Sequence, residues 1–237
     1  MQYFEAIRPS PILSTPDFSK VFGCSLPFDS KGLLRVVEMI ALPGMVFHVV
    51  QEMEKGILQV MTPKYPCSPL FLDKRAGRLT DQKEERPKVL PSIETILERM
   101  KKMVGLPYIW GGNWSSGIPE WKEWYPPKNK LSVLEETHWT FKGVDCSGLL
   151  YESTDGFTPR NTSELMDFGI EVMFDDVKPL DMILYKGHVI IALSEDEVIE
   201  SNHTYGGVRI SPLKKRIAEI AVPFTFRRFH PDAFQTL

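Results

Sequence analysis

The sequence predicts an α+β protein in which a small all-β barrel precedes a domain of helices packed on an antiparallel sheet. Two observations predict this order. Short apolar runs separated by turn residues occupy the first third of the chain, and no helical periodicity interrupts them. Beyond residue 91 helical patterns come first, and strand-like runs joined by short connectors follow. We expect domains at residues 1–76 and 92–237, with a linker at 77–91.

The predicted β region and linker rest on composition. The apolar runs are Leu33–Ile40, Met45–Gln51 and Ile57–Thr62, separated by Leu42-Pro43-Gly44 and the polar turn Glu52–Gly56. Runs of this length with turns between them are typical of a small barrel or sandwich. Residues 77–91 are mostly charged or polar and cannot bury themselves, so they are predicted to be a linker.

In the second domain, Ser92 is placed to cap a helix whose apolar positions recur with helical spacing up to Gly105. A second helix is predicted at Cys146–Ser153. A third is predicted near Asn161, which has capping-box spacing to Glu164. Strands are predicted at Leu180–Tyr185, His188–Leu193, Val198–Ser201 and Val208–Ser211.

Composition excludes several classes of protein. The net charge of −3 argues against a protein that coats nucleic acid, since such a protein needs a basic surface. No run of 18 apolar residues is present to span a membrane. The chain begins without a basic and apolar leader, so we expect a cytoplasmic protein. Three widely spaced cysteines predict free thiols and neither a zinc site nor a disulfide framework. The oligomeric state stays open.

Cys146 has the surroundings of a reactive thiol. It lies at the start of a predicted helix, where unpaired backbone N–H groups favour a thiolate and an oxyanion. A nucleophilic thiol needs a base, and His188 begins an apolar strand after a glycine turn. These two residues alone are weak evidence, because a free cysteine is more often a small buried hydrophobe. Cys24 and Cys67 lack such a setting and are predicted to be structural.

The order of several short motifs makes the prediction specific. The motifs are Tyr108-Ile109-Trp110-Gly111-Gly112, Asp145-Cys146-Ser147-Gly148, Pro159-Arg160, Pro179-Leu180-Asp181 and His188-Val189. Together they resemble the NlpC-type cell-wall peptidases, which are papain-like cysteine endopeptidases of bacterial murein peptides. The resemblance covers about residues 93–213, and it implies Cys146 as the nucleophile and His188 as the base.

The resemblance places a third member of the catalytic group twelve residues after the base, where relatives usually carry His, Asn or Gln. This position is Glu200 here. A carboxylate can orient an imidazole and stabilise the imidazolium. His203 is the rival if the returning strand carries a bulge.

The resemblance also implies contacts with substrate. Tyr108 matches a tyrosine that lines the site, and Asp145 matches the acid beside the nucleophile, which holds local structure. Ser147 and Arg160 match positions that contact the free carboxylate of a D-glutamyl residue. An arginine fork suits that carboxylate.

Two positions depart from the relatives that act on free murein peptides. Those relatives carry an Asp after the arginine, which holds the free amine of L-alanine, whereas this chain has Asn161. Thr162 replaces the Ser usually found next. An asparagine also caps helices, so recognition of the amine stays open.

The resemblance implies hydrolysis of a peptidoglycan (murein) peptide at the amide between γ-D-glutamate and the diamino acid, with no metal or organic cofactor. NlpC-type enzymes often carry a bacterial Src-homology-3-like barrel before the catalytic domain, which matches the β region predicted at 1–76. Two alternatives stay open: a catalytically weak module that binds cell-wall glycopeptide, and a thiol acyltransferase on the same fold. Intact sacculus and free peptides are both open as substrates.

All five tryptophans lie between Trp110 and Trp139. Trp110 belongs to the first motif, and the others fall in residues 113–144, a segment longer than relatives usually have between these motifs. Its prolines disfavour regular structure in the first half. We predict an inserted loop that packs on its own aromatic side chains as a hydrophobic plug, in preference to one that stacks on sugar.

Overall fold

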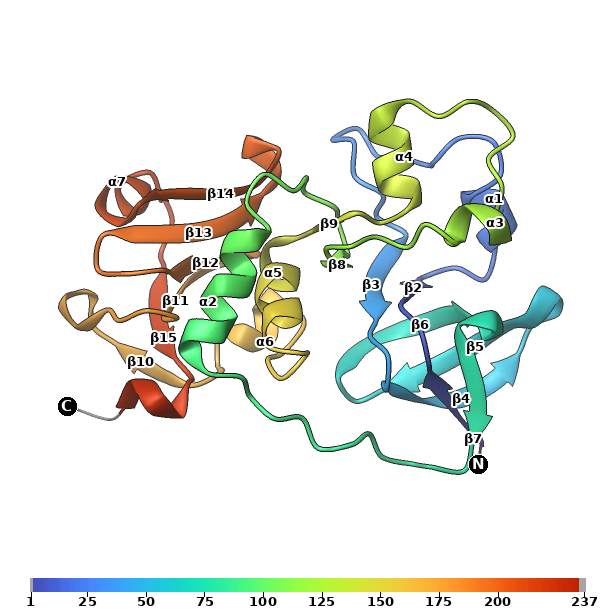
Figure 1. Cartoon of the computed structure of the whole chain (residues 1–237), viewed down its shortest axis with the longest axis horizontal. Helices are drawn as coiled ribbons and strands as arrows, with labels where there is room; N and C mark the ends of the chain where they lie inside the picture. Colours follow the sequence, from blue (N-terminus) through green and yellow to red (C-terminus); the bar gives the residue numbers. More distant parts are fainter. Residues whose placement is uncertain (1, 235–237) are drawn as a thin grey trace. The chain divides into compact units, whose positions relative to one another are not determined.

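The computed structural model describes residues 2–234, apart from the side chains of residues 67 and 68 (Figure 1). Within this part the chain divides into two compact units. The first consists of Met1–Pro87 with Ile109–Gly143, and the second of Lys88–Tyr108 with Val144–Leu237. The chain therefore returns to the first unit for residues 109–143 before it completes the second.

The first unit is built on one antiparallel sheet, with the strand order β3-β2-β6-β5-β4-β1-β7 across the described residues. Its strands are β1 (Gln2–Ala6), β2 (Ser10–Leu13), β3 (Val37–Ala41), β4 (Val46–Glu52), β5 (Ile57–Thr62), β6 (Tyr65–Asp73) and β7 (Gly77–Thr80). The apolar runs predicted β3, β4 and β5. They missed β6 because Pro66 and Pro69 interrupt it, and proline argues against a strand.

The expected closed barrel is wrong, because the two ends of this sheet, β3 and β7, are not hydrogen-bonded to each other in the structure as described. The sheet has another way to bury apolar side chains. Leu13, Ile40 and Phe71 pack in one core with Trp121 and Trp139. A sheet covered by other elements does not have to close on itself to form a core.

The linker predicted at 77–91 begins too early, because its first four residues belong to the sheet. Residues 77–80 form β7, which pairs with β1 in the register Tyr3↔Thr80. This pairing was not predicted, because β1 precedes β7 by more than seventy residues and neither strand is a long apolar run. The residues between Thr80 and Ser92 carry no helix or strand.

Residues 109–143 are anchored to the sheet of the first unit. The Asn113 side chain is fully buried and pairs with the backbone of Ile40 in β3, through an N–H···O bond in each direction of 2.8 and 2.9 Å. Gly111 has φ +73°, and a Cβ there would lie 2.7 Å from Val37. The glycine in the first motif is therefore required by its close approach to β3.

The aromatic residues of this segment form the core of the first unit together with α1 (Phe18–Val21) and the residue that follows it. The Phe22 ring lies 5.5 Å from Trp121 and 5.7 Å from Trp139. Both tryptophans are fully buried. The rings therefore do not pack only on one another, and the structural division differs from the expected domain boundaries because residues 109–143 share a core with the sheet.

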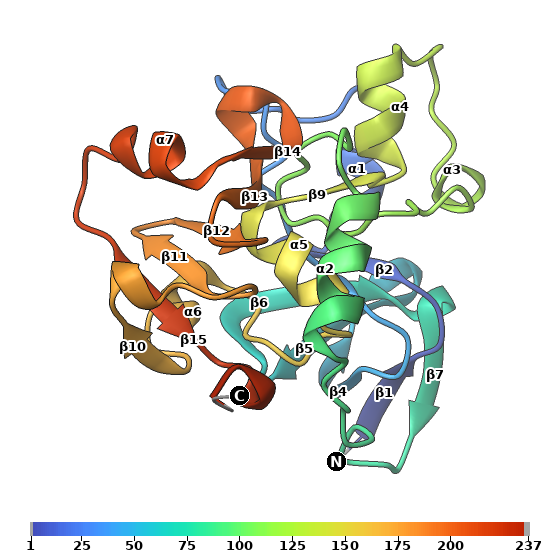
Figure 2. The same cartoon turned by 60° about the vertical axis from the view of Figure 1, so that its left-hand side comes forward.

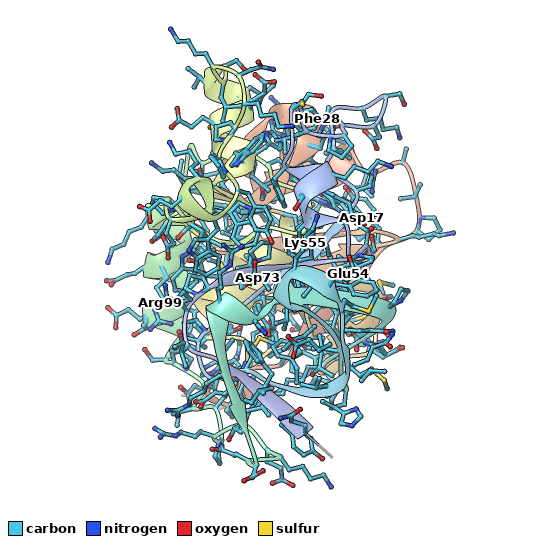
Figure 3. All side chains as sticks on the ribbon, turned by 90° about the vertical axis from the view of Figure 1, so that its right-hand side faces the viewer. Asp17, Phe28, Glu54, Lys55, Asp73 and Arg99 are labelled. Atoms are coloured by element: carbon cyan, nitrogen blue, oxygen red, sulfur yellow. The ribbon has the colours of Figure 1, made fainter. Side chains whose placement is uncertain are left out.

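The segment has regular structure in both halves, and only the helix in its first half, α3, differs from what the prolines predicted. It contains α3 (Trp121–Trp124) and α4 (Val133–Trp139). A capping box of Ser132 and Glu135 starts α4. Its His138 packs edge-on against Phe28, with the ring centroids 4.9 Å apart, and Figure 3 labels Phe28. Asp73, also labelled there, accepts a 2.7 Å hydrogen bond from the Tyr125 hydroxyl at the end of α3.

The second unit combines helices with a second antiparallel sheet. The helices are α2 (Ile93–Lys102), α5 (Cys146–Ser153), α6 (Thr162–Leu165) and α7 (Leu213–Ala218). The strand order is β10-β15-β11-β12-β13-β14 in the described residues. These strands are β10 (Ile170–Val172), β11 (Met182–Tyr185), β12 (His188–Ala192), β13 (Glu197–Asn202), β14 (Gly207–Pro212) and β15 (Thr225–Arg228). A separate short sheet pairs β8 (Asn113–Trp114) of the first unit with β9 (Gly143–Val144), whose Gly143 is the last residue of that unit.

Both faces of the second sheet are covered within its own unit. On one face α5 packs against α2 and against β12 and β13 (Figure 2). Ile191 and Ile199 belong to the core on that face. The opposite face holds Ile190 and Val198 together with Leu213 of α7. This alternation is the period of two expected for strands buried on both sides.

Replacement of Ser92 by alanine is expected to destabilise the second unit by about 1 kcal/mol. The Ser92 hydroxyl accepts a hydrogen bond from the Thr95 N–H and caps α2, as the sequence predicted. Chemical denaturation of the native and Ser92→Ala proteins measures the difference. The Ser92→Asp protein, which retains a capping oxygen, should lie close to the native one, and equal stability of all three would contradict the cap.

Candidate active site

The position of Cys146 is set by the residue before it. Asp145 is the N-cap of α5, and its carboxylate accepts a 2.7 Å hydrogen bond from the Gly148 N–H. Arg160 is 3% exposed and forms a two-pronged ion pair with this carboxylate, with N–O distances of 2.6 and 3.0 Å. It also donates a 2.9 Å bond to the Ser147 hydroxyl. A buried network thus fixes the first turn of α5 and the thiol it carries.

His188 is positioned by a tight hairpin. It pairs with Tyr185 across the β11–β12 turn, where Gly187 has φ +83°. His188 and Ile190 are two residues apart on one strand, so their side chains share a face. Val198 and Glu200 share that face on β13, because Ile190 and Val198 lie in the same core. The strand pattern therefore brings Glu200 beside His188.

The contact between these two side chains is direct. The His188 Nε2 and the Glu200 Oε2 lie 2.7 Å apart. The strands β12 and β13 pair without a register shift, and so do β13 and β14. The bulge that would have brought His203 to the base is therefore absent from these described strands. His203 lies instead after the end of β13, exposed, with its ring edge-on to Tyr108 at 5.6 Å.

The charges on this pair follow from their contacts. Burial lowers the pKa of His188, but the hydrogen bonds that its ring makes with Cys146 and Glu200 outweigh burial and raise the pKa to about 9. Burial raises the pKa of Glu200, but hydrogen bonds from His188, Arg216 and Asn202 outweigh it and lower the pKa to about 2. An imidazolium and a carboxylate thus face each other at neutral pH.

The two ring nitrogens of His188 have different partners, Glu200 and Cys146. Because Nε2 meets Glu200, the other nitrogen, Nδ1, is the one that serves the thiol of Cys146. The Cys146 Sγ also lies 4.0 Å from the carbonyl oxygen of Gly187, in the turn before the base. The three side chains form a hydrogen-bonded group that can activate a thiol for attack on an acyl carbon.

Sequence reasoning missed two residues of the site. Arg216 of α7 donates Nε to Oε1 of Glu200 at 2.5 Å, and Asn202 donates to Oε2 at 3.0 Å. A signal for Arg216 does exist, since Leu213, Ile217 and Ile220 repeat with helical spacing and all pack in the core. Arg216 falls on that apolar face, where an arginine needs a buried partner.

The remaining predicted residues have the following places. Tyr108 is half-buried, and an isolated parallel bridge pairs it with Val144, two residues before the thiol. Asn161 is the N-cap residue of α6 but its side chain makes no capping bond, and Thr162 is the first residue of that helix. The predicted capping box is therefore wrong. Trp110 lies under the Arg35 guanidinium, at 3.8 Å from the ring centroid.

The described residues provide no group of three His, Cys, Asp or Glu side chains that could hold a metal ion. None of the helices described is long and apolar enough to cross a bilayer. Cys24 is an exposed free thiol outside the group around Cys146. The prediction for Cys67 concerns a side chain outside the described part of the structure.

Comparison with known proteins gives one family. Residues 105–222 match the NlpC/P60 family. The peptidoglycan endopeptidase RipB of Mycobacterium tuberculosis, from strains CDC 1551 and H37Rv, is 28% identical over 131 residues, which are 52% of this chain and 49% of RipB. The chain thus spans about half the length of these curated relatives.

Two solved structures are similar to parts of the chain. The structure of the peptidoglycan hydrolase RipB from M. tuberculosis has 25% identity and a TM-score of 0.43, covering 58% of this chain and 65% of that one. An NlpC/P60 family protein from Bacillus cereus ATCC 10987 has 19% identity and a TM-score of 0.41, covering 97% and 64%. The similarity to this family rests on the sequence match at residues 105–222, which covers just under half of this chain.

Proposed function

We propose that this protein is a cysteine endopeptidase of murein peptides, which cleaves the amide between γ-D-glutamate and the diamino acid. The observation that carries the proposal is the hydrogen-bonded group of Cys146, His188 and Glu200 at the start of α5. A protein that only binds its ligand does not need a charged base beside a thiol, whereas a cysteine peptidase does. The NlpC/P60 domain supports murein peptide as the substrate class.

In the proposed reaction the Cys146 sulfur attacks the γ-carbonyl carbon of D-glutamate, and the oxyanion is held at the N-terminus of α5. The His188 imidazolium then protonates the amine of the diamino acid as the C–N bond breaks. Water hydrolyses the thioester, with His188 as the base. Glu200 keeps the imidazole oriented in every step and stabilises its positive charge whenever it holds the proton.

Substrate contacts are proposed for the residues that match the family positions around the thiol. Tyr108 lines the site, and Ser147 and Arg160 contact the free carboxylate of the D-glutamyl residue. Asn161 and Thr162 lie at the start of α6, on the amine side of the substrate. The neutral Asn161 offers an amine no ion pair, which favours substrates whose L-alanine amine is not free.

The pH profile of kcat/KM is expected to fall on the alkaline side with a midpoint near 9, the pKa of His188. An unperturbed histidine would place that midpoint at about 6.5. The same raised pKa stabilises the fold fully below pH 6.5, and this contribution is lost as the pH rises through about 9. A kinetic midpoint near 6.5 in the native protein would contradict the ion pair.

The proposed function is tested by digestion of a defined murein tripeptide and tetrapeptide, each with its L-alanine amine free and with that amine acetylated, followed by mass spectrometry. Cys146→Ala is the control, because it removes the sulfur and leaves the capping network of Asp145 intact. Cleavage before the diamino acid by the native protein alone is the expected result. No cleavage, or equal cleavage by the control, would overturn the proposal. A product joined to a new acyl acceptor would identify an acyltransferase instead.

A further inference from the structure

We propose that Arg216 is a positioning residue that makes a carboxylate usable as the third member of this site, by holding Glu200 in place and balancing its charge against His188. The proposal deepens the proposed function and rests on it for its catalytic meaning. Arg216 touches neither the thiol nor the base in the contacts that the structure gives, so it acts through its neighbours.

The geometry ties Arg216 to Glu200 by two hydrogen bonds. Arg216 Nε lies 2.5 Å from Oε1, and Nη2 lies 3.1 Å from Oε2. Arg216 is 5% exposed and Glu200 is fully buried. A rigid planar fork that grips both oxygens fixes the plane of the carboxylate. Oε2 is therefore held in the direction from which it meets His188 Nε2.

The same guanidinium also holds the other side of the base. Arg216 Nη2 donates a 3.2 Å bond to the Tyr185 hydroxyl. The Tyr185 ring packs on the His188 ring with centroids 5.2 Å apart and a tilt of 38°. One buried side chain on α7 thus sets the position of both groups that confine the imidazole. A lysine has all three of its donors on one nitrogen and cannot grip both carboxylate oxygens as a planar fork.

Arg216 also reduces the effect of the Glu200 charge on His188. The groups that face His188 are the Cys146 thiol from α5, Glu200 from β13 and Tyr185 from β11. Behind Glu200 lie Arg216, then Arg209 of β14 with Nη2 at 3.8 Å from Oε1, and Glu219, which lies 3.9 Å from both arginines. Arg216 is the cation in hydrogen-bond contact, so it moderates the field that Glu200 exerts on the base.

The pKa of His188 should therefore shift in one direction when Arg216 is removed and in the other when Glu200 is removed. Without Arg216, the full negative charge of Glu200 acts on the imidazolium, and the pKa of His188 rises. With Glu200→Gln, the buried cation of Arg216 stands uncompensated beside the ring, and that pKa falls by about one to three units. With both replaced by glutamine, the cation is gone and the pKa returns part of the way.

The test is an NMR titration of the full chain with 13C-labelled histidine, in the native, Glu200→Gln, Arg216→Gln and doubly substituted proteins. The chain has five histidines, and the His188→Gln spectrum identifies the signal. We expect the pKa of His188 to be highest in Arg216→Gln, followed by native, the double variant and Glu200→Gln. Equal values for native and Arg216→Gln, or for Glu200→Gln with and without Arg216, would overturn the proposal.

Two further variants separate positioning from stability. Arg228 is a matched buried arginine in the same unit, with two bonds to Asp181 of 2.6 and 2.8 Å, and Arg228→Gln should leave the pKa of His188 unchanged. Arg216→Lys keeps the charge without the fork, so kcat should fall about tenfold with KM unchanged. An equal pKa shift in Arg228→Gln, or full activity in Arg216→Lys, would overturn the proposal.

The titration needs no turnover, and this separates the two hypotheses. A protein that cleaves no murein peptide but gives the expected order of pKa values refutes the proposed function and leaves the charge balance of Arg216 and Glu200 standing. A protein that cleaves the peptide but gives equal pKa values refutes the role of Arg216 alone. The readout is a resonance of His188 in the folded protein, so loss of folding in Arg216→Gln is visible in the same spectrum. In that case the kcat of Arg216→Lys decides whether Arg216 positions Glu200.

Discussion

Replacement of Glu200 by glutamine is expected to lower kcat/KM on a murein peptide by about a hundred- to ten-thousandfold. The amide of glutamine can still accept a hydrogen bond from His188, but it carries no charge to stabilise the imidazolium. The change also leaves Arg216 buried next to a neutral group, which disfavours positive charge on the base. Steady-state kinetics of the two proteins at neutral pH measures the loss.

The matched control is His203→Ala. His203 is exposed in the turn that follows β13, and its ring meets Tyr108, not the base. We expect this variant to retain most of the native kcat/KM. If His203→Ala loses most of its activity while Glu200→Gln stays active, the third member is His203 and the site is rearranged during catalysis. Thermal unfolding of both variants distinguishes loss of chemistry from loss of folding.

The centre of the site was largely predictable because its signals are local. The bounds of α5 follow from Asp145 as the cap, and the strand that His188 begins follows from a glycine turn and an apolar run. Glu200 was placed by the resemblance, twelve residues after the base, and its contact with His188 agrees with that spacing. Arg216 was missed because its signal, a place on the apolar face of α7, lies in a short basic segment, and such a segment is typical of a solvated surface.

The first unit was less predictable, because its core is assembled from distant parts of the chain. Phe18 and Phe22 lie a hundred residues from the tryptophans they contact, and no short-range pattern reports that contact. The barrel was predicted from strands β3 to β5 alone. The strands that were missed, and the aromatic segment that covers Leu13 and Phe71, make the observed open sheet possible.

Replacement of Trp139 by alanine is expected to destabilise the first unit by about 3–5 kcal/mol. The ring is fully buried, packs against Phe22, and donates a 2.9 Å hydrogen bond from Nε1 to the carbonyl of Tyr125. Denaturant unfolding followed by tryptophan fluorescence measures the change. All five tryptophans lie within Ile109–Gly143, so this signal reports on the first unit and not on the unit that carries Cys146.

Trp121 provides the comparison that separates packing from hydrogen bonding. It is as fully buried as Trp139, but within the described residues its Nε1 has no hydrogen-bond partner. Trp121→Phe removes a polar group that gains nothing from burial, whereas Trp139→Phe leaves the Tyr125 carbonyl without its donor, a loss of about 1–3 kcal/mol. Trp139→Phe should therefore be the more destabilising of the two. The opposite order, or a Trp139→Ala protein with an unchanged fluorescence transition, would contradict the shared core that joins residues 109–143 to the sheet.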